Sequence, residues 1–193
     1  NEVEQYSVRV RILPGVAEVA QGKVSVSELK EIDMNDLLGR SEVLPDNDLL
    51  RKDIEGRVVL VTGAGGSIGS ELSRQVYNLE PVKLIILDSS EYSLYLIKNE
   101  LESMNRDIEL YSILADVTNK ERLKIIFREF GVNTIYHAAA YKHVPLVEQN
   151  PFEGIRNNIF GTLSCAQMAV EENVDTFVLI STDKAVRPTN IMG

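Results

Sequence analysis

The segment Val58–Gly69, VVLVTGAGGSIG, contains the residues whose types and spacing point most directly to chemistry. An apolar run ends at Thr62 and leads through a glycine-rich turn into a sequence that is typical of a helix. Glycines let the backbone turn tightly and let a pyrophosphate come close, while the free N–H groups of the helix face the anion. We therefore predict a dinucleotide-phosphate site formed by Gly63, Gly65, Gly66, Ser67, Ile68 and Gly69.

A carboxylate follows the next apolar run at the distance that a dinucleotide site requires. Asp88 comes after Leu84–Leu87, about twenty residues beyond the glycine turn, where an acid accepts hydrogen bonds from the ribose hydroxyls of NAD. It would repel the 2′-phosphate of NADP, and no arginine follows it at once to receive that phosphate. We predict NAD as the cofactor, with NADP as the alternative. Ser89 and Ser90 either join the ribose site or cap the next helix.

Two later segments are expected to end strands at the same edge of the sheet. Asp116 and Val117 follow the third strand, where Asp116 either contacts the adenine or caps the following helix. Small side chains follow the fourth strand and let a cofactor lie against the backbone: Ala138, Ala139 and Ala140.

These residues need a sheet whose strands all end at one edge. From residue 57 onward the pattern alternates strands and helices, which is typical of a doubly wound parallel sheet with right-handed crossovers. Continuous apolar runs such as Leu84–Leu87 and Phe177–Ile180 indicate strands that are covered on both faces. The predicted fold class is α/β, of the Rossmann type. We predict strands at 57–62, 83–88, 109–115, 133–137 and 175–181, and helices at 67–79, 91–104, 119–130 and 152–172.

Residues 1–56 differ in pattern from the rest of the chain. Residues 6–13 alternate as a strand does and residues 24–26 suggest a second short strand, but the apolar residues are too few for a separate core. We predict the tail of a preceding domain plus a linker, and an NAD(P)-binding Rossmann domain at 57–193. The chain does not begin with Met and stops at Gly193. We therefore expect a longer protein, of which most of a C-terminal substrate lobe is absent here.

Composition argues against several function classes. A net charge of −9 without any basic run argues against nucleic-acid binding. The single cysteine, Cys165, cannot form an internal disulfide and is predicted to be buried. His137 is likewise predicted to be a packed strand residue rather than a base. No apolar run approaches the roughly 18 residues needed to span a bilayer, and we predict no metal site.

Several motifs carry a resemblance to known families. Residues 62–69, Asp116-Val117 and residues 137–140 resemble the extended short-chain dehydrogenase/reductase superfamily. Three further segments resemble, more narrowly, the polysaccharide-biosynthesis nucleotide-sugar dehydratases of the CapD/WbpM/PglF type. They are DLLGR at 36–40, YKHVPLVE at 141–148 and STDKAVRPTNIMG at 181–193.

The resemblance implies a Rossmann domain followed by a substrate lobe. It implies a reaction in which a UDP-N-acetylhexosamine, typically UDP-N-acetylglucosamine, loses water to give a 4-keto-6-deoxy sugar, with NAD(P) held tightly and recycled in each turnover. It also implies a longer bacterial protein with N-terminal membrane helices, at the cytoplasmic face of the inner membrane, whose product enters surface polysaccharide or glycan synthesis. Members of the superfamily commonly pair through helices such as 119–130 and 152–172, so a homo-oligomer is expected.

That reaction gives roles to neighbouring residues after the fifth strand. Asp183 is the candidate acid for the departing C6 hydroxyl, Lys184 is the candidate base for the C5 proton, and the Thr182 hydroxyl faces the C4 oxygen. The acid and the base each need a shifted pKa, which requires burial or charged partners. Apart from the resemblance, the same segment is equally typical of a solvated turn with an exposed ion pair. The residues expected to contact the sugar nucleotide are Lys142, His143 and Arg187.

Met192 departs from the pattern of the superfamily, most of which has a tyrosine there and a lysine four residues later. Methionine cannot act as acid, base or phenolate, so the residue that deprotonates the C4 hydroxyl is unassigned. Methionine at this position favours the large membrane-associated type. We expect the chain to be inactive without the substrate lobe. The alternatives are a nucleotide-sugar 4-epimerase, a dehydratase that also inverts C5, and a non-catalytic NAD-binding module.

Overall fold

The structure, a computed structural model, describes residues 11–12, 30–31 and 46–192. The chain divides into two compact units, residues 1–45 and 46–193. In the first unit, β1 (Arg11–Ile12) pairs antiparallel with β2 (Lys30–Glu31). The remainder of the strand predicted at 6–13 lies outside the described residues, as do residues 24–26 and the DLLGR segment.

A five-stranded parallel sheet forms the centre of the second unit, as the alternation of strands and helices predicts. The strand order is β5-β4-β3-β6-β7, so the chain winds outward in both directions from β3. In this register Thr62 lies beside Leu87 and His137, which brings the strand ends to one edge. All five predicted strands are confirmed, with ends that agree within two residues: β3 (Val58–Thr62), β4 (Lys83–Asp88), β5 (Glu109–Leu114), β6 (Thr134–His137) and β7 (Thr176–Leu179).

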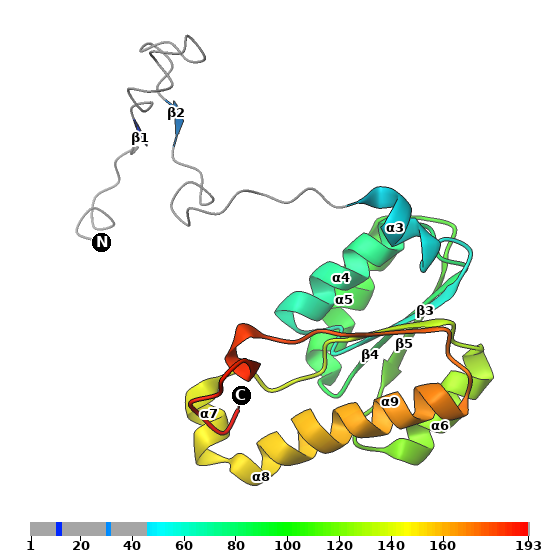
Figure 1. The fold of residues 1–193 in the computed structure, drawn as a ribbon. Helices are drawn as coiled ribbons and strands as arrows, with labels where there is room; N and C mark the ends of the chain where they lie inside the picture. Colours follow the sequence, from blue (N-terminus) through cyan, green and yellow to red (C-terminus); the bar gives the residue numbers. More distant parts are fainter. Residues whose placement is uncertain (1–10, 13–29, 32–45, 193) are drawn as a thin grey trace. The chain divides into compact units, whose positions relative to one another are not determined.

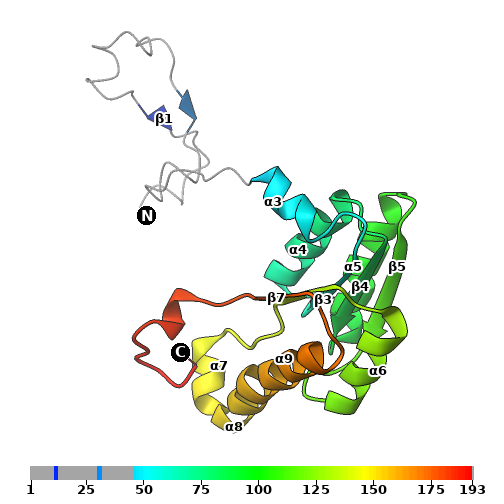
Figure 2. The same cartoon turned by 45° about the vertical axis from the view of Figure 1, so that its right-hand side comes forward.

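Helices cover both faces of this sheet (Figure 1, Figure 2). On one face lie α4 (Ser67–Asn78) and α5 (Glu91–Ser103), and on the other lie α6 (Lys120–Phe130) and α9 (Thr162–Glu171). Alternate residues of β3 therefore enter different cores. Val59 and Val61 pack in the α4–α5 layer, whereas Leu60 packs in the α6–α9 layer. Burial on both faces explains why these strands are apolar throughout.

The helix predicted at 152–172 is interrupted in the structure. α8 (Pro151–Gly154) leads into a π-helical segment, η1 (Ile155–Gly161), before α9 begins. Two short elements are not predicted by the sequence pattern: α7 (Val144–Gln149) and the 3-10 turn η2 (Asp183–Ala185). Both are too short to show a helical period of apolar residues. Among the helices of residues 46–192, none combines the length and the apolar character that crossing a bilayer requires.

Residues 46–56, which the sequence pattern assigns to the linker, belong instead to the second unit. α3 (Asn47–Lys52) begins after Asp46, whose carboxylate accepts hydrogen bonds from the N–H groups of the first turn. Ile54 is buried in the α4–α5 core, and the carbonyl of Asp53 accepts a 2.7 Å hydrogen bond from the Thr134 hydroxyl. That bond joins positions 81 residues apart, so no local pattern in the sequence could reveal it.

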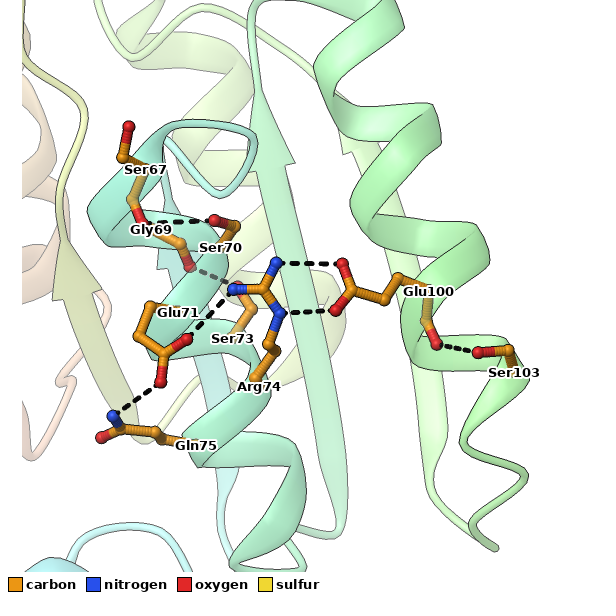
Figure 3. Close-up of polar contacts among 9 residues, drawn as sticks. All are labelled: Ser67, Gly69, Ser70, Glu71, Ser73, Arg74, Gln75, Glu100 and Ser103. Carbon is orange, nitrogen blue, oxygen red and sulfur yellow. Dashed lines mark hydrogen bonds and ion pairs between the residues drawn. The ribbon is translucent and has the colours of Figure 1, made fainter. Parts of the chain in front are cut away.

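Arg74 ties α4 to α5 on the outer side of their layer (Figure 3). Its guanidinium donates to both carboxylate oxygens of Glu100, at 2.5 and 2.9 Å, and to Glu71 at 3.1 Å. The hydrogen bonds from Arg74 lower the pKa of Glu100. Gln75 also donates to Glu71, which extends the network along α4.

We expect Arg74→Met to lower the free energy of unfolding by about 1 kcal/mol or less, because the pair is partly exposed and screened by water. Urea unfolding at low and high salt measures the effect. The matched control is Arg106→Met, which removes a single 3.4 Å contact with Glu80 and is expected to change stability less. A loss of several kcal/mol for Arg74→Met would contradict this assessment.

Candidate functional site

A cleft opens at the carboxyl edge of the sheet, where doubly wound sheets bind ligands. Its empty space is about 500 Å³, including the part that is open to solvent. The walls are the end of β4, the stretches that directly follow β3, β4, β5 and β6, and Asn157. The predicted cofactor residues that line it are Gly63, Gly66, Asp88, Ser89, Asp116, Val117, Ala138, Ala139 and Ala140.

The glycine turn forms one wall of the cleft and has no space for side chains. Gly63 has a φ of +65°, and a Cβ there would lie 2.7 Å from backbone atoms of Ala138 and Ala139. A Cβ at Gly69 would lie 2.0 Å from the carbonyl oxygen of Gly63, so α4 can approach the turn this closely only with glycine. Gly65 lies equally close to α5, where a Cβ would come within 2.4 Å of a side chain.

The N-terminus of α4 borders the same wall, because its N-cap residue, Gly66, lines the cleft. The first turn of α4 carries no charged side chain and no side-chain cap. Its free N–H groups are therefore available to an anion such as pyrophosphate. Ser67 and Ile68 are exposed at this helix end, and Lys142 Nζ donates to Ser67 Oγ at 3.3 Å. Lys142, predicted to contact substrate, thus places a positive charge beside the N-terminus of α4.

Asp88 joins the glycine turn to the loop before α5. Its Oδ2 accepts a 2.8 Å hydrogen bond from the N–H of Gly65, and its Oδ1 accepts one of the same length from the N–H of Ser90. A carboxylate has about four lone-pair sites, so both oxygens can still accept from ribose hydroxyls. Ser90 caps α5 by accepting from Ser93 N–H, whereas Ser89 lines the cleft. The two serines that the sequence left undecided therefore have different roles.

Asp116 lies in the cleft and does not cap α6. Its Oδ1 accepts a 2.8 Å hydrogen bond from the N–H of Thr118 within the loop. The N-cap of α6 is Asn119, whose side chain accepts from the N–H of Arg122. Of the two interpretations of Asp116, the structure therefore excludes the helix cap. Val117 is buried beneath it against Gly161, where a Cβ would lie 2.9 Å from the valine side chain.

Four lining residues were not predicted: Leu87, Ala115, Tyr141 and Asn157. Two asparagines of the π-helical segment, Asn157 and Asn158, hold the part of the cleft lining that contains Tyr141. Asn158 accepts from the N–H of Tyr141 at 2.8 Å and donates to its carbonyl at 3.0 Å, while Asn157 donates to Asn158 at 3.0 Å. Two adjacent asparagines inside a helical pattern disfavour a helix interior, and this was the available signal. π-helical turns are frequent at functional sites.

His137 is a packed strand residue, as predicted. The ring is 1% exposed, with Nδ1 2.8 Å from Thr62 Oγ1 and Nε2 3.0 Å from Thr162 Oγ1. It stacks on Phe177 at a centroid distance of 5.9 Å. Burial lowers its pKa from 6.5 to about 4, so the ring is neutral at physiological pH. A neutral ring that is enclosed in this way has no access to a substrate proton.

We expect acid to destabilise the protein through His137. Because the folded state holds the pKa near 4, the unfolded state binds the proton more tightly. The full stabilisation is present above pH 6.5 and is lost progressively as the pH falls to 4, by about 3 kcal/mol in total. Urea unfolding across this range measures it. His137→Gln removes this pH dependence, whereas His143→Gln, at the exposed start of α7, retains it. An unchanged slope in His137→Gln would refute the assignment.

The predicted acid–base residues lie after β7, outside the lining of the cleft. The Asp183 side chain is 92% exposed and lies 3.7 Å from Lys184 Nζ, which belongs to a side chain that is 50% exposed. The Thr182 hydroxyl donates to Asp183 Oδ1 at 3.0 Å. This hydrogen bond and the charge of Lys184 lower the pKa of Asp183, whereas a general acid needs a raised one. Lys184 is a charged partner, but it shifts the pKa of Asp183 in the opposite direction, and neither side chain is buried.

The segment beyond β7 returns to α7 (Figure 1), where Glu148 Oε1 accepts a 2.6 Å hydrogen bond from the N–H of Ile191. Arg187 is exposed in this segment with a φ of +55°, and His143 is exposed at the start of α7. Among the residues that the structure describes, no group of three His, Cys, Asp or Glu side chains could hold a metal ion. Cys165 is buried, as predicted, and burial raises its pKa to about 12.

The chain is similar in sequence to several known proteins. CapD, a capsular polysaccharide biosynthesis protein of Staphylococcus aureus, is 48% identical over 182 residues, which cover 94% of this chain and 30% of that protein. A UDP-N-acetylglucosamine 4,6-dehydratase (inverting) of Campylobacter jejuni is 35% identical over 72% of this chain and 40% of its own length. A UDP-glucose 4-epimerase of Rickettsia rickettsii is 28% identical over 71% of this chain and 40% of its own length. The chain therefore spans less than half the length of these relatives.

The chain is also similar to proteins whose structures have been solved. The X-ray structure of Pen from Bacillus thuringiensis matches with a TM-score of 0.68 and 30% identity, over 73% of this chain and 43% of that one. The dTDP-glucose 4,6-dehydratase DesIV of Streptomyces venezuelae, solved as a double mutant with NAD, matches with a TM-score of 0.59 and 27% identity, over 69% and 46%. Residues 59–193 match the polysaccharide biosynthesis protein family. This match and the identity to CapD show that the chain belongs to that family, within the extended short-chain dehydrogenase/reductase superfamily.

Proposed function

We propose that this chain is the cofactor-binding part of an NAD-dependent nucleotide-sugar 4,6-dehydratase of polysaccharide biosynthesis. The substrate would be a UDP-N-acetylhexosamine, typically UDP-N-acetylglucosamine. The observation that carries the proposal is the convergence on one cleft of the glycine turn, Asp88 and the alanine wall, which consists of Ala138, Ala139 and Ala140. The identity to dehydratases and the segment Thr182–Lys184 support the reaction type.

The residues of the cleft fit a dinucleotide. The close approach of Gly63 to the Ala138–Ala139 backbone and the uncapped N-terminus of α4 suit a pyrophosphate, and the Asp88 carboxylate suits an unsubstituted ribose. The same carboxylate would repel the 2′-phosphate of NADP, which favours NAD. The NAD-bound dehydratase among the structural relatives supports this cofactor. When bound, NAD supplies reversible oxidation at C4 of the sugar and reduction at C6.

The residues after β7 would move the protons of the reaction. Lys184 takes the proton from C5, and Asp183 gives a proton to the C6 hydroxyl, which leaves as water. Thr182 orients the C4 oxygen through its hydroxyl. For this role the Asp183 carboxyl must hold a proton near neutral pH, so the substrate and the rest of the protein must desolvate it and raise its pKa. Met192 cannot deprotonate the C4 hydroxyl, and another group has to supply that step.

The second candidate function is nucleotide-sugar 4-epimerisation, which the identity to an epimerase supports. It shares the oxidation at C4 but loses no water, and it does not require the acid–base pair Asp183 and Lys184. Incubation of the protein that includes the substrate lobe with UDP-N-acetylglucosamine, followed by mass spectrometry, separates the two. Loss of one water supports dehydration. An unchanged mass with conversion to the galacto sugar would replace our proposal by epimerisation, and bound NAD without any reaction would favour a non-catalytic module.

The resemblance also leads us to propose a location and an assembly for the longer protein. It would be anchored at the cytoplasmic face of a bacterial inner membrane, where its product enters surface glycan synthesis. It would pair through α6 and α9, whose outer faces expose Ile125, Leu163 and Val170. Membrane fractionation and sedimentation of the longer protein test the two proposals. A protein that stays in the supernatant as a monomer would contradict both.

A further inference from the structure

Three linked polar side chains, two of them buried and one partly buried, lie next to residues that line the cleft. Thr62 at the end of β3, His137 at the end of β6 and Thr162 at the start of α9 are linked through the two ring nitrogens, at 2.8 and 3.0 Å. Thr62 and His137 are both shielded from solvent, and the ring has Phe177 stacked against it. The described residues include no buried side-chain nitrogen or oxygen that lacks a hydrogen-bond partner, so this chain is fully satisfied.

Each member directly adjoins a different wall of the cleft. Thr62 precedes Gly63, the turn residue with positive φ, and its carbonyl accepts a 3.1 Å hydrogen bond from the N–H of Ala138. His137 precedes the three alanines. Thr162 follows the π-helical segment that carries Asn157 and the Asn158 clamp on Tyr141. One imidazole thus connects the glycine turn, the alanine wall and a third wall of Asn157, Asn158 and Tyr141, which we call the asparagine wall.

The chemistry of histidine suits this position better than that of an apolar residue. A planar ring with nitrogens on two sides can bond a strand and a helix at once, and a neutral ring presents one donor and one acceptor. Threonine hydroxyls accept either role, so the chain is satisfied whichever tautomer is present. Loss of one hydroxyl would leave a buried nitrogen unpaired, which costs more than the bond itself contributes. The resulting shift would move the helix that carries the asparagine wall.

We propose that His137, held by Thr62 and Thr162, is a positioning residue that sets the spacing of the dinucleotide cleft. This inference rests on the proposed function, because it presumes that the cleft binds NAD. It assigns His137 no contact with the cofactor. The asparagine wall is held against the glycine turn through the imidazole, and this contact is independent of the bonds within the sheet.

The test compares NAD affinity with stability in the 193-residue chain. Thr162→Val keeps the shape of the side chain and removes its hydroxyl, and we expect the Kd for NAD to rise at least tenfold while circular dichroism shows a folded protein. Thr162→Ser retains the hydroxyl and is expected to restore the parental Kd. Thr62→Val, on the other side of the ring, provides a second and independent variant with the same expected effect.

The matched control lies at the opposite end of β6. Thr134→Val removes another buried threonine hydroxyl, which donates to the Asp53 carbonyl at 2.7 Å. It is expected to lower Tm as much as Thr162→Val without changing the Kd for NAD. A parental Kd in Thr162→Val and Thr62→Val, or an equal rise in Thr134→Val, would overturn the positioning role alone. A folded parent chain that binds no NAD would overturn the proposed cofactor and this inference together.

Discussion

The substitution Gly63→Ala is expected to destabilise the Rossmann unit by about 2–5 kcal/mol and to remove measurable NAD binding. Two costs add at this position. A residue with a side chain at a φ of +65° is strained by about 1–2 kcal/mol, and the new Cβ would lie 2.7 Å from the backbone of the alanine wall. The neighbouring atoms belong to the backbone of Ala138 and Ala139, in the loop after β6, so no side-chain rotation can relieve the contact. Urea unfolding and calorimetric titration with NAD measure the two effects.

The control for this prediction is Gly131→Ala. Gly131 has nearly the same φ, +62°, at the end of α6, but a Cβ there would meet no atom within 4 Å. It therefore carries the conformational strain alone, and we expect a loss of about 1–2 kcal/mol with unchanged NAD binding. If the two variants lost equal stability, close packing of the turn against the alanine wall would not be the reason for glycine at position 63.

The substitution Asp183→Asn is expected to lower the rate of water loss from the sugar nucleotide by about 10²- to 10⁴-fold in the protein that includes the substrate lobe. An amide cannot give a proton to the C6 hydroxyl, and its size leaves the surroundings nearly unchanged. Because Asp183 lies outside the lining of the cleft, the Kd for NAD should stay at its parental value. Mass spectrometry of the sugar nucleotide over time measures the rate, and fluorescence titration measures NAD binding.

Asp107→Asn is the matched control, since Asp107 is an exposed aspartate in the loop before β5, at the other edge of the sheet from the cleft. It is expected to leave the rate unchanged. The rate of the parent should also fall at high pH, because Asp183 must be protonated to act as an acid. A nearly parental rate for Asp183→Asn would remove this residue from the reaction. A slow variant that also lost NAD would point to a structural effect.

The cleft residues and the proposed acid–base residues lie in different environments in this structure. The cofactor cleft is assembled here by four strand ends and a helix N-terminus, all of which are packed against the core. The proposed acid–base residues lie on a short turn where their side chains are exposed, and further along the chain the N–H of Ile191 donates to Glu148. Their environment therefore depends on what covers them, and we expect substrate and the substrate lobe to provide the burial that raises the pKa of Asp183.

The amino-acid sequence by itself determined the parts of this protein whose signals are local. Strands that are buried on both faces are apolar at every position, and the glycine turn requires a particular residue at each step, so both are visible in a window of about ten residues. The sheet, its order of strands and helices, and most of the cleft lining follow from such windows. The buried state of His137 and Cys165 also follows, since both lie within apolar patterns.

The tertiary structure alone decided which distant residues meet. The contacts between Asp88 and Gly65, between Asn158 and Tyr141, and between Asp53 and Thr134 join positions 23, 17 and 81 residues apart. Such pairs depend on the register of neighbouring strands and on the path of the π-helical segment, neither of which leaves a periodic trace in the sequence. The same holds for the hydrogen bonds that enclose His137. A hydrogen bond depends on the positions of two groups in space, whereas apolar burial depends mainly on the type of one residue.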